Sequence, residues 1–151
     1  MLLIDSGKLF FETTGLKPEC VEIDPEQREL IEKSGFKSYS ALEESSEKYD
    51  LVFTSNVLEH IENRVDFLKN IIKQIPWDRG LQKKILIRVP MVDRDWITIY
   101  KKQMGIECRL DKTHYTEYTY LQFKDELNKS NIEIVSHHIQ YGELYAVCKA
   151  K

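Results

Sequence analysis

The stretch Tyr49–Ile61, YDLVFTSNVLEHI, constrains the fold more than any other part of the sequence. An acid, Asp50, precedes the apolar run Leu51–Phe53, and the small polar residues Thr54–Asn56 follow that run. A short run of β-branched and aromatic residues that ends in small polar ones is typical of a buried parallel strand. The sequence therefore predicts an α/β fold with these polar residues at the carboxyl end of a strand, where open α/β sheets bind ligands.

The composition is that of an ordinary globular protein: 151 residues, 42% hydrophobic and 31% charged, with a net charge of −3. This length suits one domain over residues 1–151. The slightly acidic balance argues against nucleic acid as a partner, because such partners require a basic surface. No segment approaches the ~20 apolar residues of a membrane span, and no secretory signal precedes the domain, so the sequence predicts a cytoplasmic protein. The three cysteines lack CxxC spacing and predict neither a disulfide framework nor a zinc knuckle.

The N-terminal residues have the order of a nucleotide-binding βαβ unit. Leu2–Ile4 is predicted as a strand, Asp5-Ser6-Gly7 as a turn, Lys8–Thr14 as about two helical turns and Glu19–Ile23 as the next strand. A glycine in such a turn lets the backbone approach a ligand closely, because it has no side chain and adopts positive φ.

Glu22 lies at the carboxyl end of the predicted strand Glu19–Ile23, directly before a helix start. Asp24 is suited to cap that helix, Pro25 to its first position and Gly35 to its end. An acid at the position of Glu22 accepts hydrogen bonds from ribose hydroxyls in nucleotide-binding βαβ units. The alternative is a solvated acid at a strand end, and the agreement of spacing and cap favours the ribose role.

The rest of the chain continues to alternate between strands and helices. Helices are expected at Arg64–Gln74, at Asp93–Met104 and from Thr119 onward, where Gln122 completes a capping box. A hairpin is expected from Ile132–Gln140 and Glu143–Cys148, joined at Tyr141-Gly142.

This alternation predicts how the strands pair. Glu19–Ile23, Asp50–Ser55 and Lys84–Val89 should lie as parallel strands in one sheet, with Glu143–Cys148 antiparallel to them.

The phrases VEIDPE at residues 21–26 and YDLVFTSNVLEHI at residues 49–61 resemble motifs of the class I S-adenosylmethionine-dependent methyltransferases. The resemblance implies a Rossmann-like sheet that is mostly parallel with an antiparallel terminal strand, helices on both faces and an abbreviated N-terminus. It also implies S-adenosylmethionine as the cofactor, and methyl transfer to a small-molecule or glycan-type acceptor. It leaves the oligomeric state open.

The resemblance further implies which residues bind the cofactor. Ser6 and Gly7 match the first loop, Glu22 matches the ribose acid, and Ser55 and Asn56 match the end of the fourth strand.

The first loop of this family carries several glycines, whereas this chain keeps only Gly7 and has Asp5 where a glycine is expected. A carboxylate there would crowd the amino-acid end of the cofactor, so weak cofactor affinity is predicted. Two alternatives follow: a degenerate, non-catalytic methyltransferase-like binding or assembly subunit, and a nucleotide-binding dehydrogenase module, against which the single-glycine loop and the LEHI segment count.

His60 and His114 are the candidate catalytic bases, because histidine titrates near neutral pH. The alternative for each is a structural histidine. Some small-RNA and quinone O-methyltransferases carry E-x-x-E-H, and the RNA enzymes add a later histidine, to hold magnesium. Here Asn56 replaces the first carboxylate of that motif, which weakens a site for a hard cation, so no metal is assigned.

Overall fold

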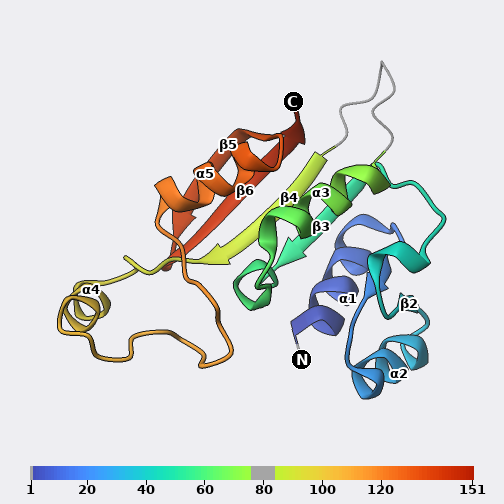
Figure 1. Cartoon of the computed structure of the whole chain (residues 1–151). Helices are drawn as coiled ribbons and strands as arrows, with labels where there is room; N and C mark the ends of the chain where they lie inside the picture. The colour runs from blue at the N-terminus through green and yellow to red at the C-terminus, as the bar shows by residue number, and fades with distance from the viewer. Residues whose placement is uncertain (1, 76–83) are drawn as a thin grey trace. The chain divides into compact units, whose positions relative to one another are not determined.

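The computed structural model describes residues 2–75 and 84–151, with side chains from Lys8 onward (Figure 1). It divides into two compact units, Met1–Glu47 and Lys48–Lys151, which are described separately. The single domain expected over residues 1–151 stays a prediction.

The first unit begins with helix α1, Leu2–Thr14, and this corrects the sequence analysis. The strand expected at Leu2–Ile4 and the turn expected at Asp5-Ser6-Gly7 are both wrong, because one continuous helix runs through them. The helix ends at Gly15, whose φ of 70° lets its N–H donate to the carbonyl of Phe11. Gly7 is tolerated inside the helix at a cost of about 1 kcal/mol relative to alanine.

Strand β1, Glu19–Val21, pairs in parallel with β2, Lys37–Tyr39, and helix α2, Pro25–Lys33, connects them. Asp24 caps α2 as predicted, since its carboxylate accepts from the N–H groups of Glu26 and Gln27. The left-handed Gly35, with a φ of 83°, follows the helix end. Ile31 is fully buried, and the ring of Phe36 meets that of Phe11 edge to face. A 3₁₀ turn, η1, covers Leu42–Glu44.

The second unit is built on a four-stranded sheet in the order β3-β4-β6-β5. The strands are β3 at Leu51–Ser55, β4 at Lys84–Pro90, β5 at Ile132–Gln140 and β6 at Glu143–Ala150. β3 and β4 are parallel, whereas β6 is antiparallel to both β4 and β5. Because β6 lies between β4 and β5, the C-terminal hairpin completes the sheet (Figure 1).

The core of this unit follows the strand period of two. Three buried residues of β4 each pair directly with a buried residue of β6: Ile85 with Cys148, Ile87 with Ala146, and Val89 with Leu144. Burial raises the pKa of the Cys148 thiol to about 12, so it is a neutral core residue.

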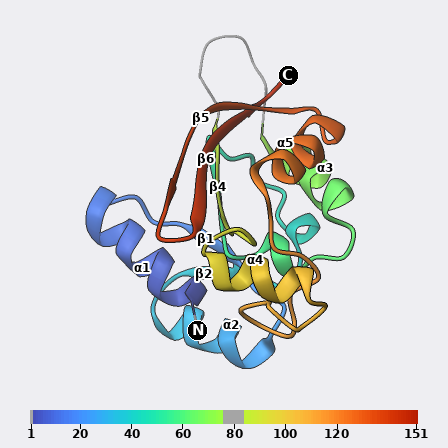
Figure 2. The same ribbon diagram turned by 90° about the vertical axis from the view of Figure 1, so that its left-hand side faces the viewer.

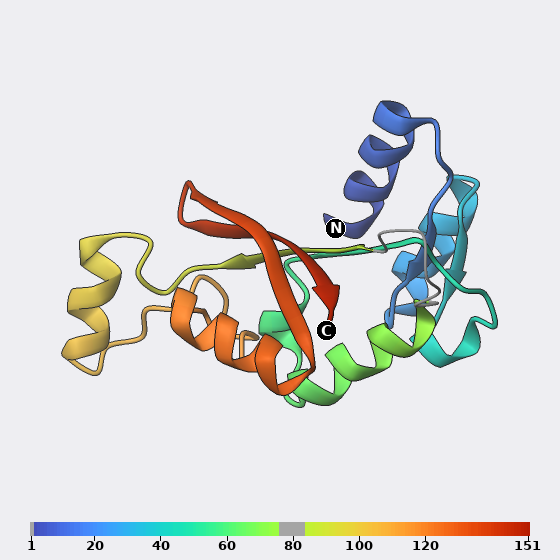
Figure 3. The same cartoon turned by 90° about the horizontal axis from the view of Figure 1, so that it is seen from above.

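Helices α3, Arg64–Gln74, and α5, Tyr120–Lys129, lie side by side on one face of this sheet (Figure 3). Their buried side chains are Leu68 and Ile71 on α3, and Phe123 and Leu127 on α5. An ion pair between Arg64 and Glu126 joins the two helices, with 2.9 Å between Nε and Oε1.

Helix α4, Trp96–Gln103, follows β4 and lies beyond the carboxyl end of that strand (Figures 1 and 2). A long loop, residues 104–119, leads back from it to α5. This loop carries His114 to the same end of the sheet, where its residues bond to the segment after β3.

The α/β class, with parallel strand pairs and an antiparallel terminal strand, is confirmed. The pairing expected for Glu19–Ile23 is wrong, because β1 forms a two-stranded sheet with β2 among the described residues, while β3 and β4 belong to the four-stranded sheet. Among the residues that the structure describes, no helix has the length and apolar character needed to cross a membrane.

Candidate functional site

The end of strand β3 is shaped by Asn56, which has a φ of 52°. Its N–H donates to the carbonyl of Arg88 at 3.0 Å, so the pairing with β4 extends to Asn56 before the chain turns. Asparagine tolerates this left-handed conformation better than most residues. The turn brings the short 3₁₀ helix η2, Leu58–His60, back over the end of the sheet.

Three buried side-chain oxygens in this segment have no hydrogen-bond partner among the described residues: Thr54 Oγ1, Asn56 Oδ1 and Glu59 Oε2. Buried polar atoms are nearly always paired, so three within six residues of chain mark an unusual place. Unpaired oxygens of this kind are suited to a ligand, an ion or an ordered water.

Glu59 is almost completely buried, with 1% of its surface exposed. Its backbone carbonyl accepts the N–H of Tyr115 at 2.7 Å, which ties the loop of residues 104–119 to η2. Burial raises the pKa of the Glu59 carboxyl to about 7 because the charged form is desolvated, and the carboxylates of Glu143 and Glu117 add to this effect. The Glu59 carboxylate is therefore costly to hold without a positive partner.

His60 is held by a short chain of hydrogen bonds. Its Nδ1 lies 3.0 Å from the hydroxyl of Thr113, and that hydroxyl donates to the Asp111 carboxylate at 2.8 Å. The single proton of the Thr113 hydroxyl is already donated to Asp111, so the proton between His60 and Thr113 must be carried by the His60 ring. This assigns the Nδ1–H tautomer to neutral His60 and leaves the lone pair on Nε2.

His114 is held in the same way by a buried acid. Its Nδ1 lies 3.0 Å from Oε1 of Glu117, which is 5% exposed and also accepts the N–H of Leu110. The other oxygen of Glu117 bonds to Arg94, whose guanidinium also donates to the carbonyls of Met91 and Cys108. Glu117 is thus an ionised acceptor, and His114 also presents the lone pair of Nε2.

The two imidazole rings meet edge to face, with 4.7 Å between their centroids. One ligand atom each from Glu59, His60 and His114 lies within 4.8 Å of the others. Two imidazole rings and a buried carboxylate therefore lie close together at the carboxyl end of β3.

A second polar network lies beside Asn56. Glu143 at the start of β6 accepts from Asn56 Nδ2 at 3.4 Å, from Arg88 and from the Tyr145 hydroxyl at 2.9 Å. The Arg88 side chain also lies over the Tyr145 ring. Sequence analysis missed Glu143 and Arg88, although a charged residue within the apolar run of β4 was an available signal.

Glu22 belongs to the first unit and follows β1 directly. Its N–H donates to the Tyr39 carbonyl at 2.9 Å, and its carboxylate accepts the N–H of Asp24 at 3.0 Å. Arg28 donates to the Glu22 carbonyl at 2.9 Å, which fixes the backbone of this turn. The half-buried carboxylate is therefore held in place at the strand end.

The predicted site residues thus divide into three groups. Ser55, Asn56, His60 and His114 come together at the end of β3, while Glu22 stands at the end of β1. Ser6 and Gly7 lie in α1, and the turn on which their cofactor role depended is not formed there.

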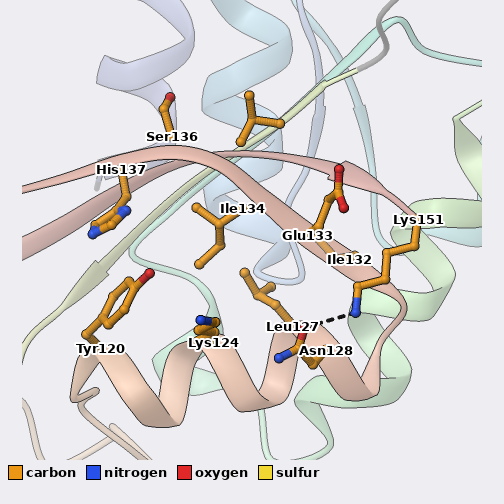
Figure 4. A pocket seen from close by; sticks show the side chains of 11 residues that line it. Tyr120, Lys124, Leu127, Asn128, Ile132, Glu133, Ile134, Ser136, His137 and Lys151 are labelled. Carbon is orange, nitrogen blue, oxygen red and sulfur yellow. Dashed lines mark hydrogen bonds between the residues drawn. The ribbon is translucent and has the colours of Figure 1, made fainter.

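A separate groove of about 330 Å³ runs between α5 and β5 (Figure 4). The ring of Tyr120 stacks on that of His137 at one end, and Lys151 donates to Asn128 at the other. None of the predicted site residues lines this groove, so it is not the candidate site.

No family model matches the sequence, and the comparison with curated proteins found no match. Solved structures, in contrast, match nearly the whole chain. A SAM-dependent methyltransferase from Archaeoglobus fulgidus aligns with 98% of this chain and 82% of its own, at 13% identity and a TM-score of 0.65. LepI in complex with SAM aligns with 99% of this chain at 13% identity and a TM-score of 0.70, over 41% of its own length.

The N,N-8-amino-8-demethyl-D-riboflavin dimethyltransferase RosA from Streptomyces davawensis aligns with 88% of this chain at 14% identity and a TM-score of 0.60. This chain spans about two fifths of the length of RosA, 41%. These likenesses show that the chain has the class I methyltransferase fold, as the sequence motifs predicted.

Proposed function

We propose that this chain binds S-adenosylmethionine and transfers its methyl group to a small-molecule or glycan-type acceptor. The observation that carries the proposal is the fold likeness over nearly the whole chain to a SAM-dependent methyltransferase from Archaeoglobus fulgidus and to LepI, which is solved in complex with SAM. Each unit taken by itself agrees with it, because an acid follows β1 in the first unit and unpaired polar atoms follow β3 in the second, and strand ends of this kind bind nucleotides in α/β folds.

In this proposal Glu22 holds the ribose of the cofactor. Its carboxylate is fixed by Asp24, and its backbone is fixed by Arg28. Ser55 and Asn56 contribute from the end of β3, where Asn56 Oδ1 has no partner among the described residues. Ser6 and Gly7 are left out of the proposal because they lie within α1.

His60 and His114 are the proposed catalytic residues. Each presents the Nε2 lone pair, because Nδ1 is bonded to Thr113 and to Glu117. Transfer of a methyl group to a hydroxyl or amine requires that the acceptor lose a proton, which a neutral imidazole accepts. The buried carboxylate of Glu59 lies beside them and, when ionised, stabilises the imidazolium that forms when a histidine accepts the proton.

The ribose role of Glu22 predicts that its replacement weakens binding of S-adenosylhomocysteine. Glu22→Ala should cost about 1.5–3 kcal/mol, or roughly 10- to 150-fold in Kd, the range for hydrogen bonds to a charged group. Glu22→Gln keeps an oxygen for Asp24 but loses the charge, and should cost part of this amount. Isothermal titration measures both, with the exposed Glu29→Ala of α2 as the matched control.

An affinity that is unchanged in folded Glu22→Ala would contradict the ribose role. A wild-type chain that binds neither S-adenosylmethionine nor S-adenosylhomocysteine would contradict the proposed function itself and would favour the non-catalytic binding or assembly subunit.

A further inference from the structure

Glu59, His60 and His114 form a cluster of potential metal ligands on one unit of the chain. Their ligand atoms lie within 4.8 Å of one another. η2 and the loop of residues 104–119 supply these residues, and the hydrogen bond from Tyr115 N–H to the Glu59 carbonyl holds the two segments together. The two backbone segments that carry the three side chains are therefore held together.

The hydrogen bonds at Nδ1 leave the Nε2 lone pair of each histidine available to bind a metal ion. Thr113 takes the Nδ1–H of His60, and Glu117 takes the Nδ1–H of His114. A metal-ligating histidine typically donates its other N–H to a carboxylate or another acceptor, which fixes the ring and raises its basicity. Glu117 is itself held by Arg94 and by the N–H of Leu110, so its hold on the His114 ring is fixed.

Glu59 supplies the negative charge. Its side chain is almost completely buried, and Oε2 has no hydrogen-bond partner among the described residues. The neighbouring acids are neutralised, because Arg94 pairs with Glu117 and Arg88 pairs with Glu143. Glu59 Oε2 has no partner within residues 8–75 and 84–151, so a cation would supply one that these residues do not.

We propose that Glu59, His60 Nε2 and His114 Nε2 bind one divalent transition-metal ion. Two imidazole nitrogens with one carboxylate suit Zn²⁺, Fe²⁺ or Mn²⁺, whereas Mg²⁺ favours oxygen ligands alone. A tetrahedral zinc ion holds its ligands about 3.4 Å apart, so a pair at the 4.8 Å limit must close by about 1.4 Å. That change is within reach of side-chain rotation, because His60 is exposed.

The absence of a charge at position 56 does not prevent this site. Sequence analysis assigned no metal because Asn56 cannot supply a carboxylate to a hard cation. In the structure Asn56 instead donates to Glu143, and the proposed ligand set includes His114 from a distant loop. Three protein ligands leave a position for water or for a hydroxyl group of a bound molecule.

This inference concerns metal binding and does not depend on methyl transfer. A bound ion would occupy the Nε2 lone pairs of His60 and His114, so these residues act either as metal ligands or as the proposed free bases, and metal titration decides between the two roles. Chelator-treated full-length protein is titrated with Zn²⁺ against a chromophoric chelator, and the variants His60→Ala, His114→Ala and Glu59→Gln are measured alongside. We expect one ion per chain and at least a 100-fold loss of affinity in each variant. His137→Ala, which removes an exposed histidine outside the cluster, should bind as the wild type does.

Glu117→Gln tests the positioning residue, because it keeps the side-chain shape but weakens the hold on His114. Loss of such a partner lowers metal affinity about 10- to 100-fold, so this variant should fall between the wild type and His114→Ala. Circular dichroism of every variant identifies any that fail to fold. If His114→Ala fails to fold, Glu117→Gln and His60→Ala remain as independent tests of the site.

Two outcomes would overturn the proposal. Wild-type protein that binds Zn²⁺ no more tightly than folded His60→Ala has no site at this cluster. Equal affinity for Mg²⁺ and Zn²⁺ would show that the imidazole nitrogens are not ligands. Both outcomes are independent of S-adenosylhomocysteine titration, so failure of the metal site and failure of the proposed function can be told apart.

Discussion

Gly142 supports the candidate site from outside it. Its φ is 77°, and a Cβ at this position would lie 2.6 Å from the Cβ of Arg94. The Gly142 carbonyl also accepts the N–H of Met91 at 2.9 Å. Because Arg94 holds Glu117, and Glu117 holds His114, this glycine allows the hairpin tip to approach the frame of the site.

Gly142→Ala should therefore destabilise the protein through both backbone strain and the clash with Arg94. We expect a loss of about 2–4 kcal/mol in the free energy of unfolding. Gly105→Ala is the matched control, because its φ is 69° and no atom lies within 4 Å of its added Cβ. That variant should lose about 1–2 kcal/mol from strain alone. Urea unfolding measures both, and equal losses would show that the contact with Arg94 is unimportant.

At the scale of single residues, the sequence singled out His60 and His114, as candidate catalytic bases and not as metal ligands, but it did not identify the residues that hold them. His60 and His114 were identified by their chemistry and by the motif around His60. Glu117, Arg94 and Thr113 were not, because their roles depend on contacts between a loop and segments far away in the sequence.

Helix α5 begins with the capping box that the sequence predicted. The Thr119 hydroxyl accepts the N–H of Gln122 at 3.3 Å, and the Gln122 side chain accepts the N–H of Thr119 at 3.0 Å. This cap fixes where the loop that carries His114 ends and α5 starts.

Thr119→Ala should lower the free energy of unfolding by about 1 kcal/mol, the usual cost of a lost N-cap. Thr119→Ser keeps the hydroxyl and should lose much less. The comparison by urea unfolding isolates the cap from the loss of the methyl group, and an equally large loss in Thr119→Ser would contradict the capping role.

Among the elements, those with strong local signals were predicted well. The cap at Asp24, the apolar period of Arg64–Gln74 and the turn at Tyr141-Gly142 all appear as expected. The N-terminal element was wrong because a short apolar run beside a glycine fits both a strand with a turn and a helix. Leu2–Thr14 forms the helix.

The division of the strands between two sheets depends on the whole molecule. Strand pairing joins residues far apart in sequence, and local patterns do not specify which strands become neighbours. Each unit has a core of its own, with Ile31 fully buried in the first and Leu144 fully buried in the second.

Because the two cores are separate, a cavity made in one core should reduce the hydrogen-exchange protection of backbone amides in its own unit and not in the other. Ile31→Ala and Leu144→Ala should each cost about 2–5 kcal/mol where the cavity forms. In hydrogen exchange, Ile31→Ala should expose the Glu22 amide, which bonds to Tyr39, and leave the Tyr118 amide, which bonds to Pro90, protected. Leu144→Ala should do the reverse. Equal loosening of both amides in either variant would show that the units unfold as one.

The continuous C-terminal segment of α5, β5 and β6 also bears on the order of folding. Its helix contacts the next strand along the chain, and a two-residue turn joins β5 to β6, so forming these contacts closes only short loops. Pairing of β3 with β4 joins Leu51 to Lys84 and closes a much longer loop, at a higher cost in chain entropy. Local contacts form faster than distant ones. The hairpin should therefore form early and provide the surface on which Arg94, and through it His114, is positioned late in folding.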